Sequence, residues 1–251
     1  MKKNPITTTL RLTMLLTLFC LLISATDTLA KKKKVLVFCK TAGFHHGSIK
    51  QGVVALFKLG AENKFDVDTT TNSANINGAN LKKYDAVIFL NTTGDILNEE
   101  QQNAFIKYIQ SGKGFVGVHA ATDCESKWQW YGNLVGAYFG GHPAQQVAKL
   151  NVVDHNHLST KNLPGVWSRK DEWYNFKWMA KDLKVLITID ETSYDPGKEA
   201  MGENHPMAWY HEYDGGRAFY TGLGHTEDSY GEPMFLAHLL GGIKYALKQK
   251  K

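Results

Sequence analysis

The sequence predicts an α/β fold in which a doubly wound, mostly parallel sheet is followed by a β-rich C-terminal part. Two observations carry this prediction. Short continuous apolar runs, such as residues 35–38 and 86–90, are typical of strands buried on both faces. Segments with helical apolar spacing alternate with these runs, and the connections are short. This alternation favours a parallel sheet with helices on both of its faces.

The first half of the chain alternates regularly between strand and helix. In chain order we expect a strand over 35–38, a helix over 48–59, strands over 65–69 and 85–90, a helix from about Asn98 to Gly112, and a strand over 114–118. Asn98 is a favourable N-cap, and Gly112 is a favourable residue to end a helix. Ligands of such sheets bind beyond the carboxyl ends of the strands, so residues 40–47, 91–95 and 119–124 are the segments to inspect.

The second half is less regular, and a β-rich edge on the same domain describes it most simply. We expect a helix over 128–139, strands over 146–153, 185–189, 207–213 and 217–221, and a closing amphipathic helix over 233–247. Asp214-Gly215-Gly216 between the last two strands is typical of a hairpin turn. No internal repeat or low-complexity linker divides the chain, so residues 31–251 are predicted to form one domain.

The net charge of +5 has its source at the N-terminus. Residues 1–30 contribute +2 and the lysine run 31–34 contributes +4, which leaves −1 for the rest of the chain. A body this balanced lacks the basic surface that a phosphate backbone requires. We therefore expect no nucleic-acid partner.

Residues 1–30 have the layout of a secretory signal peptide. Basic residues precede an apolar run over 12–23, and small residues lead to a cleavage site near Ala30. The run is too short to span a bilayer of about 30 Å, so no stable membrane insertion is expected. A lipoprotein attached through Cys20 is the weaker alternative, because Phe19 before it is bulky. The sequence therefore predicts a secreted or periplasmic protein.

Two cysteines, Cys39 and Cys124, remain after such a cleavage. In an oxidising compartment they could form a disulfide, and a pair of buried free thiols is the alternative that the sequence leaves open. No CxxC pair is present, so neither a cysteine metal site nor a redox site is predicted.

The sharpest chemical signal is Gly117-Val118-His119-Ala120-Ala121, directly after a predicted strand. Small residues on both sides are typical of a strained strand-to-helix turn that pushes one side chain into a pocket. An imidazole at that point excludes acyl transfer by Ser or Cys and leaves a general acid or base, a hydrogen-bond donor or a metal ligand. The alternative is a histidine satisfied by neighbouring backbone. Asp123, four residues later, favours the functional interpretation.

Other polar clusters fall at the ends of other predicted elements. They are Gly43-Phe44-His45-His46-Gly47, Asn91-Thr92-Thr93-Gly94-Asp95, Gly140-Gly141-His142-Pro143, Asp171-Glu172-Trp173-Tyr174 and Thr221-Gly222-Leu223-Gly224-His225. Adjacent side chains point apart, so we expect only one of His45 and His46 to face a site. Each cluster alone is more often structural than functional. Several such clusters on one rim of a sheet are a stronger signal than any single one.

Aromatic side chains are frequent near these clusters. They are Trp128, Trp130, Tyr131, Trp173, Tyr174, Trp178 and Trp209. Rings of this kind stack on the C–H faces of sugars, and equally they fill cores and interfaces because of their large area. The sequence leaves both roles open.

Together these stretches resemble the ThuA-like (trehalose utilisation) family, whose fold is similar to flavodoxin-like proteins and class I glutamine amidotransferases. The resemblance extends from about Val35 to Ala246. It is carried by residues 41–46 (TAGFHH), 89–95 (FLNTTGD), 114–123 (GFVGVHAATD), 171–176 (DEWYNF) and 220–225 (YTGLGH). Family members more often have Arg where this chain has His45, so His46 is the matching histidine.

The resemblance implies a function as well as a fold. Amidotransferases present a cysteine at the turn where this chain has His119, so no glutaminase activity is implied. The family is linked to the catabolism of trehalose and related disaccharides through 3-keto-sugar intermediates. The resemblance thus implies a small sugar as the partner of this chain.

The first hypothesis is an enzyme that acts on such a disaccharide or on its 3-keto derivative. A carbonyl at C3 acidifies the neighbouring C–H, so cleavage or isomerisation needs a base for that proton and an acid for the leaving oxygen. His119 and Glu172 would be base and acid in either order, and Asp123 completes the predicted catalytic set. The residues expected to hold the sugar are His46, Asn91, His142, Trp173, Tyr174 and His225.

Two further hypotheses come from other classes. In one, a divalent ion such as Zn²⁺ is the cofactor, and the ligands come from His46, His119, His142 and His225 with Glu172. The chain has no compact H-x-x-x-H spacing, so this signal is diffuse. In the other, the chain is a non-catalytic sugar-binding module. The sequence leaves a homo-oligomer open.

Overall fold

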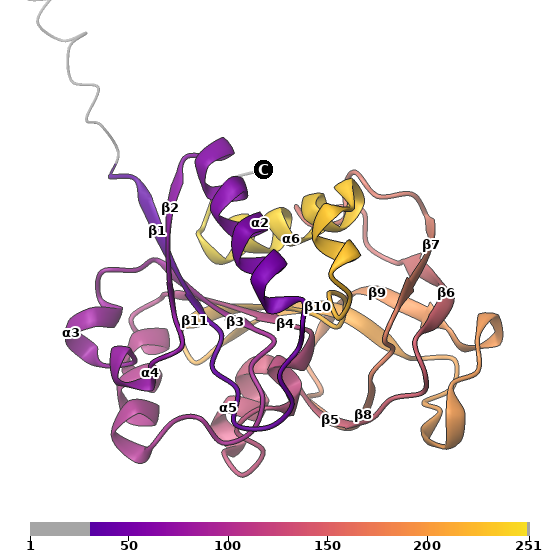
Figure 1. The fold of residues 1–251 in the computed structure, drawn as a ribbon, viewed down its shortest axis with the longest axis horizontal. Coiled ribbons are helices and arrows are strands. Elements are labelled where there is room, and N and C mark those ends of the chain that lie inside the picture. The colour runs from indigo at the N-terminus through magenta and orange to yellow at the C-terminus, as the bar shows by residue number, and fades with distance from the viewer. Residues whose placement is uncertain (1–30, 250–251) are drawn as a thin grey trace, which may run out of the picture. The chain divides into compact units, whose positions relative to one another are not determined.

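The computed structural model describes residues 31–249 (Figure 1). Within this range, one large sheet has the strand order β2-β1-β3-β4-β11-β10-β9-β6-β7. Its parallel part consists of β2 (Phe65–Thr70), β1 (Lys33–Phe38), β3 (Ala86–Leu90), β4 (Gly114–Val118) and β11 (Gly216–Thr221). Its antiparallel part consists of β10 (Pro206–Tyr213), β9 (Lys184–Asp190), β6 (Gln146–Val152) and β7 (Val166–Asp171).

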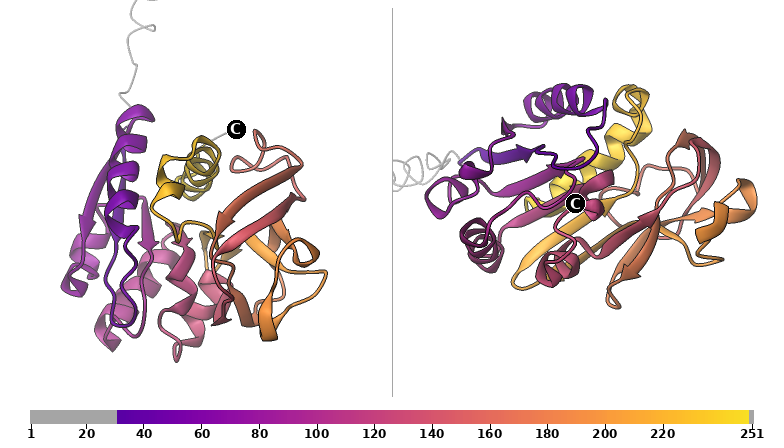
Figure 2. Two further views of the ribbon diagram at one scale, coloured as in Figure 1. Left: turned by 45° about the vertical axis from the view of Figure 1, so that its right-hand side comes forward. Right: turned by 60° about the horizontal axis from the view of Figure 1, so that its bottom comes forward.

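Helices cover both faces of the parallel part, as the alternation of elements predicts (Figures 1 and 2). On one face lie α2 (Ile49–Glu62) and α6 (Pro233–Ala246). On the other lie α3 (Gly78–Leu81), α4 (Glu99–Gln110) and α5 (Gln129–Val135). The α/β class and the central parallel sheet are therefore confirmed.

The two faces build two separate cores because strand side chains alternate in direction. Along β1, Val35 and Val37 pack with the core under α2 and α6. Leu36 and Phe38 pack with the other core, under α4 and α5. All four side chains are almost completely buried, which is why this strand is a continuous apolar run in the sequence.

The helix predicted to begin near Asn98 shows the expected termini. The Asn98 side chain accepts a hydrogen bond from the backbone N–H of Gln101, and the Gln101 side chain accepts one from the backbone N–H of Asn98, which forms a capping box. At the other end Gly112 has a φ of +84°, which glycine adopts without strain. Local chemistry thus sets both ends of α4.

The prediction of a helix over 128–139 is wrong in its second half. The helix α5 ends at Gly136, which has a φ of +96°. A Cβ at this position would lie 2.4 Å from Nε1 of Trp209, so the close approach of the Trp209 ring requires glycine here. The chain then forms β5 (Ala137–Gly141), which pairs antiparallel with β8 (Asn175–Met179).

Strands β5, β7 and β8 are additions to the predicted elements. In β7 the inward positions include Arg169 and Asp171, which are buried and charged, so the strand lacks the apolar alternation that predicts one. The antiparallel strands also continue the central sheet, so the expected β-rich part is not distinct from it.

Three further sequence predictions concern the signal peptide, membrane insertion and the cysteines. The predicted signal peptide, residues 1–30, lies outside the described residues. Within residues 31–249, none of the helices is long and apolar enough to cross a membrane. Cys39 and Cys124 are both buried free thiols, which is the second of the two alternatives.

Strand direction brings five loops to one edge of the sheet. The strands β1, β3, β4 and β11 are parallel, so their carboxyl ends meet there. Each step from β11 through β10, β9 and β6 to β7 is antiparallel, which makes β7 run in the same direction as β11. The residues that follow β7 therefore belong to the same edge.

The two parts of the sheet also meet at this edge. The carboxylate of Asp171, at the end of β7, accepts hydrogen bonds from the backbone N–H groups of Gly224 and His225 at 2.9 and 3.1 Å. Three strands separate β7 from β11 in the sheet order. The sheet must therefore curl until its last strand contacts the loop after β11.

Candidate functional site

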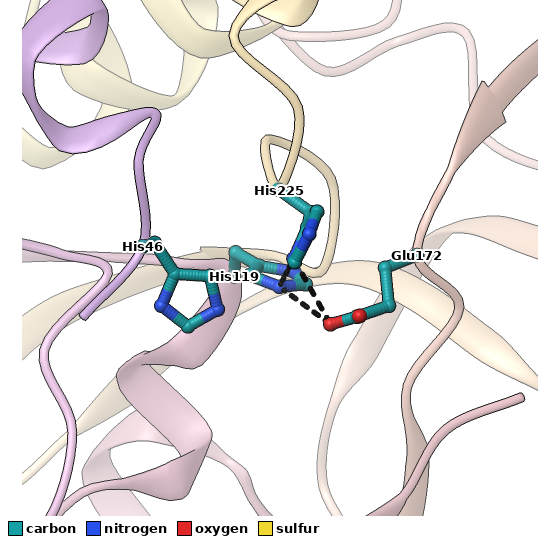
Figure 3. A group of neighbouring side chains, drawn as sticks. All are labelled: His46, His119, Glu172 and His225. Carbon is teal, nitrogen blue, oxygen red and sulfur yellow. Dashed lines mark hydrogen bonds and ion pairs between the residues drawn. The ribbon is translucent and has the colours of Figure 1, made fainter. Parts of the chain in front are cut away.

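Four side chains from four different loops converge at this edge (Figure 3). They are His46 after β1, His119 after β4, Glu172 after β7 and His225 after β11. One nitrogen or oxygen atom from each lies within 4.8 Å of the corresponding atom of every other. We call these four residues the histidine–glutamate cluster. All four are candidate site residues from the sequence, and the fold brings them together.

His119 occupies the strained turn that the small flanking residues predict. Its φ is +47°, a left-handed conformation that a non-glycine residue rarely adopts. A Cβ on Gly117 would lie 3.0 Å from the ring of Tyr220, so the turn is packed too tightly for a larger residue there. The strained backbone of His119 is characteristic of positions whose side chain is held for function.

A backbone hydrogen bond orients the His119 ring. Its Nδ1 lies 2.8 Å from the carbonyl oxygen of Gly222. A carbonyl oxygen only accepts hydrogen bonds, so Nδ1 carries a proton and donates it to this contact. The Nε2 atom then faces the cluster, 3.3 Å from Oε2 of Glu172 and 3.2 Å from Nδ1 of His225. His119 thus presents one defined nitrogen to the other three residues.

The three imidazoles of the cluster pack edge-to-face against one another. The ring centroids of His46, His119 and His225 are 5.0 to 5.1 Å apart in every pair. Their planes are nearly perpendicular, with interplanar angles of 88°, 84° and 76°. This is an edge-to-face triangle rather than a stack, and Figure 3 shows the three rings grouped beside the Glu172 side chain.

Glu172 supplies the negative charge of the cluster. Its Oε2 lies 3.0 Å from Nδ1 of His225 and 3.3 Å from Nε2 of His119. Burial by itself raises the pKa of Glu172. Hydrogen bonds from the imidazoles of His119 and His225 and the charges of these two rings together outweigh burial, and the net pKa is well below its usual value. The carboxyl group is therefore ionised at neutral pH.

His46 is the electrically neutral member. Burial, and secondarily the charges of His119 and His225, lower the pKa of His46 to about 3. Its Nδ1 is buried and has no hydrogen-bond partner among the described residues. The neighbouring His45 points elsewhere, toward the hydroxyl of Thr41 at 3.2 Å, so one histidine of the pair faces the site, as expected.

The other two predicted residues that touch the cluster are His142 and Tyr174. His142 lies at the rim, with a side chain that is 41% exposed and an Nδ1 atom 3.3 Å from Oε1 of Glu172. Tyr174 is buried, and its ring centroid lies 4.1 Å from that of His119. Tyr174 therefore forms a wall behind the imidazole, while His142 is accessible to a ligand.

Three predicted site residues do not join the cluster. Trp173 is fully buried in the core, and its Nε1 donates to the carbonyl oxygen of Gln146 at 2.9 Å, so its indole is not a platform for stacking. Asn91 is also fully buried, and its amide donates to Ser48 Oγ at 2.9 Å, which makes it a brace between loops. Asp123 is partly buried, and burial raises the pKa of its carboxyl group.

Two accessible residues beside the cluster are absent from the sequence predictions. Phe44 is 66% exposed, and its ring meets that of His46 edge-to-face at 4.8 Å. Gln145 places its side-chain Nε2 2.8 Å from Nε2 of His225. For Phe44, its place between Gly43 and His45 in a predicted loop was a signal that the sequence offered. Gln145 has no such signal, because only the tertiary structure brings it to His225.

Asp171 is a positioning residue that the sequence shows only as the neighbour of Glu172. It is fully buried, and besides its bonds to the loop after β11 it pairs with Arg169 Nη2 at 3.1 Å. Its Oδ1 also accepts a hydrogen bond from the backbone of Glu172. It therefore links the backbones that carry Glu172 and His225.

Comparison with known proteins supports the fold and identifies the family. The sequence pattern of the ThuA family, described as trehalose utilisation, matches residues 34–246. A ThuA-like protein of Bacteroides uniformis is 22% identical with a TM-score of 0.73, and the match covers 88% of this chain and 95% of that one. A ThuA-like protein of Parabacteroides merdae is 23% identical with a TM-score of 0.71, over 88% of this chain and 93% of that one.

More distant structures share the fold only. A β-galactosidase of Bacillus circulans is 13% identical with a TM-score of 0.58, and the match covers 89% of this chain but 33% of that one. No curated protein matches this chain. The family pattern covers most of the chain, including all four residues of the histidine–glutamate cluster. The chain therefore belongs to the ThuA family, whose description is trehalose utilisation.

Proposed function

We propose that this chain is an enzyme that cleaves or isomerises a trehalose-like disaccharide in its 3-keto form. The observation that carries the proposal is the contact between the oriented Nε2 of His119 and the ionised Glu172, at 3.3 Å. Family membership supports the substrate class, and the buried acid–base pair supports the chemistry. Both groups lie in one cluster at the sheet edge where ligands of such folds bind.

A carbonyl at C3 makes the proton on C2 acidic. A base takes the C2 proton, the electron pair of that bond forms a C1–C2 double bond, and the C1–O bond breaks. The departing oxygen then needs a proton from an acid, and the released sugar leaves as an alcohol. The reaction requires one group that accepts a proton and another that gives one.

The protonation states favour one order of the two roles. Glu172 is ionised, because its pKa is well below the usual value, so it accepts a proton rather than donates one in the resting state. The same carboxylate lies 3.3 Å from Nε2 of His119, the nitrogen left free by the contact of Nδ1 with the Gly222 carbonyl. We therefore assign the base to Glu172 and the acid to His119, while His225 contacts the same carboxylate at 3.0 Å and His142 contacts the sugar from the rim.

The direct test is turnover of 3-keto-trehalose by His119→Ala and Glu172→Gln. Each variant should lose about 10²–10⁴-fold in kcat, which is the usual contribution of a general acid or base. His155→Ala is the matched control, since His155 is an exposed histidine outside the cluster. Unchanged turnover in His119→Ala would eliminate this mechanism.

A second candidate is a metal-dependent reaction on the same substrates. It is favoured by the four ligand atoms of the cluster, which lie within 4.8 Å of one another. Imidazole nitrogen and carboxylate oxygen are ligands that Zn²⁺ prefers, and the bond from His119 Nδ1 to a backbone carbonyl is typical of histidines that bind metal. An ion held by His46, His119, His225 and Glu172 would supply Lewis acidity toward a sugar oxygen.

Elemental analysis of protein purified without added metal distinguishes the two candidates. The metal-dependent reaction requires close to one equivalent of a transition metal, which His46→Ala should reduce and His155→Ala should leave unchanged. Less than about a tenth of an equivalent, with activity that survives chelation, would exclude it.

A further inference from the structure

A hollow of about 690 Å³ lies directly beside the histidine–glutamate cluster. His225 forms part of its lining, as does Gln145, whose amide contacts the His225 ring. The opposite walls come from β7, through Ser168 and Lys170, and from the segment before α6, through Glu227. The volume falls within the range of about 300–1,000 Å³ that is usual for small-molecule sites. The hollow is therefore large enough to extend the site beyond the cluster.

The lining is polar, and its charges have both signs. Arg169 and Lys170 are basic, Glu227, Asp228 and Glu232 are acidic, and hydroxyl groups of Ser168, Thr226 and Ser229 stand among them. A phosphate-binding pocket would have a surplus of basic groups. Interleaved donors and acceptors without a surplus of positive charge suit a neutral ligand that carries many hydroxyl groups.

Arg169 strengthens this conclusion because its charge is already neutralised. The guanidinium group is 4% exposed, and it pairs with Asp171 at 3.1 Å and with Glu232 at 3.3 Å. Its Nη2 also donates to Ser229 Oγ at 2.7 Å. Its Nε atom is buried without a hydrogen-bond partner among the described residues. Arg169 therefore provides no net charge for an anion.

The position of β7 explains why this wall is open. It is the last strand of the sheet, so its outer edge pairs with no other strand of the described chain. Ser168 and Lys170 alternate with the buried Arg169 and are exposed. A ligand that reaches the cluster can thus lie along the end of β7, past His225.

We propose that this hollow is the subsite for the second sugar ring of a neutral disaccharide whose reacting ring lies against the histidine–glutamate cluster. The inference rests on the proposed function and adds where the leaving sugar lies. It assigns Ser168 and Lys170 to that ring, and it predicts selection against substrates with a phosphate on the second ring.

The test compares the binding of two sugars that lack the C3 carbonyl and therefore bind without reacting. Trehalose has two rings and methyl α-D-glucoside has one, and calorimetry gives the dissociation constant of each. Ser168→Trp fills the hollow from an exposed strand position. Val166→Trp is the matched control, because Val166 is exposed on the same face of β7 and does not line the hollow. Lys170→Ala is a milder variant that leaves the strand intact.

The expected result is that the chain binds trehalose at least about 10-fold more tightly than the glucoside. Ser168→Trp should remove this preference and leave glucoside binding unchanged, while Val166→Trp changes neither. Lys170→Ala should weaken trehalose binding by about 3- to 10-fold, the value of one hydrogen bond. Trehalose 6-phosphate should bind more weakly than trehalose.

Three results would overturn the inference. If Ser168→Trp changes neither affinity, the hollow holds no sugar. If it weakens both sugars equally, the hollow holds the reacting ring instead. If the unaltered chain binds neither sugar, the inference and the proposed substrate class fail together. A preserved preference for trehalose combined with full turnover in His119→Ala would refute only the proposed chemistry.

Discussion

The parallel and antiparallel parts of the sheet contribute different chemistry to one site. The parallel strands carry His46, His119 and His225, all of them imidazoles at strand ends. The antiparallel part carries Glu172, the carboxylate that contacts His119 and His225, and the β7 wall of the hollow. An isolated parallel half would be a cluster of histidines without a counter-charge. The curl of the sheet is therefore what makes the site chemically complete.

The largest expected effect comes from breaking the joint between the two parts. Asp171→Asn removes the buried charge that pairs with Arg169 at 3.1 Å and weakens the bonds to Gly224 and His225. Loss of one partner of a buried ion pair typically costs about 3–5 kcal/mol, and here Glu232 retains part of the pairing. We expect a loss of about 3 kcal/mol in chemical denaturation.

The control for this variant is Asp182→Asn, an exposed aspartate whose replacement should change the free energy of unfolding by less than about 0.5 kcal/mol. Equal stability of Asp171→Asn and Asp182→Asn would mean that the two parts are joined by other contacts.

The next effect is the pH dependence of stability that comes from a buried histidine of the parallel part. His238, on α6 of the parallel part, is buried, and burial is the main reason why its pKa is lowered to about 3. The unfolded chain binds this proton below about pH 6.5, whereas the folded chain binds it only below about 3. The contribution of His238 to the free energy of unfolding is therefore fully present above pH 6.5. It decreases as the pH falls toward 3, by up to about 1.4 kcal/mol per pH unit.

Denaturant unfolding between pH 7 and pH 4 measures this slope. His238→Gln should make the dependence of the unfolding free energy on pH shallower by up to about 1.4 kcal/mol per pH unit, which is the value of one proton. The exposed His155→Gln should leave this dependence unchanged. An unaltered slope in His238→Gln would show that other groups account for the acid sensitivity.

A smaller effect is expected from the support of Tyr174 in the antiparallel part. His205 is fully buried, with Nε2 2.8 Å from the carbonyl oxygen of Tyr174 and Nδ1 2.9 Å from Oε1 of Glu191. His205→Ala removes this link and lets the Tyr174 ring move away from His119. We expect a loss of about 1–3 kcal/mol in stability and a lower kcat with little change in KM.

Measuring kcat and KM separately, at a temperature well below the melting transition, distinguishes a positioning role from general destabilisation. A positioning role predicts a lower kcat with little change in KM. His211→Ala removes another buried histidine, bonded to the carbonyl oxygen of Leu134 at 2.9 Å, and serves as the comparison. If both variants lower kcat equally, His205 has no particular role in holding Tyr174.

The smallest effect concerns the rim of the parallel part. Phe44 is 66% exposed, so Phe44→Ala should leave the melting temperature unchanged. Its ring stands beside His46, where it can stack on a sugar, and its loss should raise KM by about 3- to 10-fold with little change in kcat. Phe57→Ala on α2 is the control, with a ring that is 45% exposed and lines a different hollow, beside Leu36 and Val67. Equal KM values in the two variants would contradict a contact between Phe44 and substrate.

Much of the parallel half could be predicted because its signals are local. The apolar runs of β1, β3 and β4 follow from burial on both faces, and the ends of α4 follow from Asn98 and Gly112. The turn at His119 was indicated by small neighbours, since only they allow a strained backbone to pack against Tyr220. Each of these features depends on residues close together in the chain.

The antiparallel half was less predictable because its signals are not local. The charged residues of β7 resemble a polar loop until Arg169 and Asp171 are seen to pair with each other in the interior. Trp173 and Asn91 resembled ligand contacts, and the fold instead uses them as core and brace. In these cases burial depends on partners that are distant in the sequence.

The sequence by itself determined the α/β class, the strained histidine turn and the residue types available for acid–base chemistry. Only the tertiary structure decided which of these residues meet. Glu172 reaches His119 because a run of antiparallel strands returns β7 to the direction of β11 and the sheet curls toward it. Strand direction and curl result from pairing across the whole sheet, and no local stretch of residues encodes them.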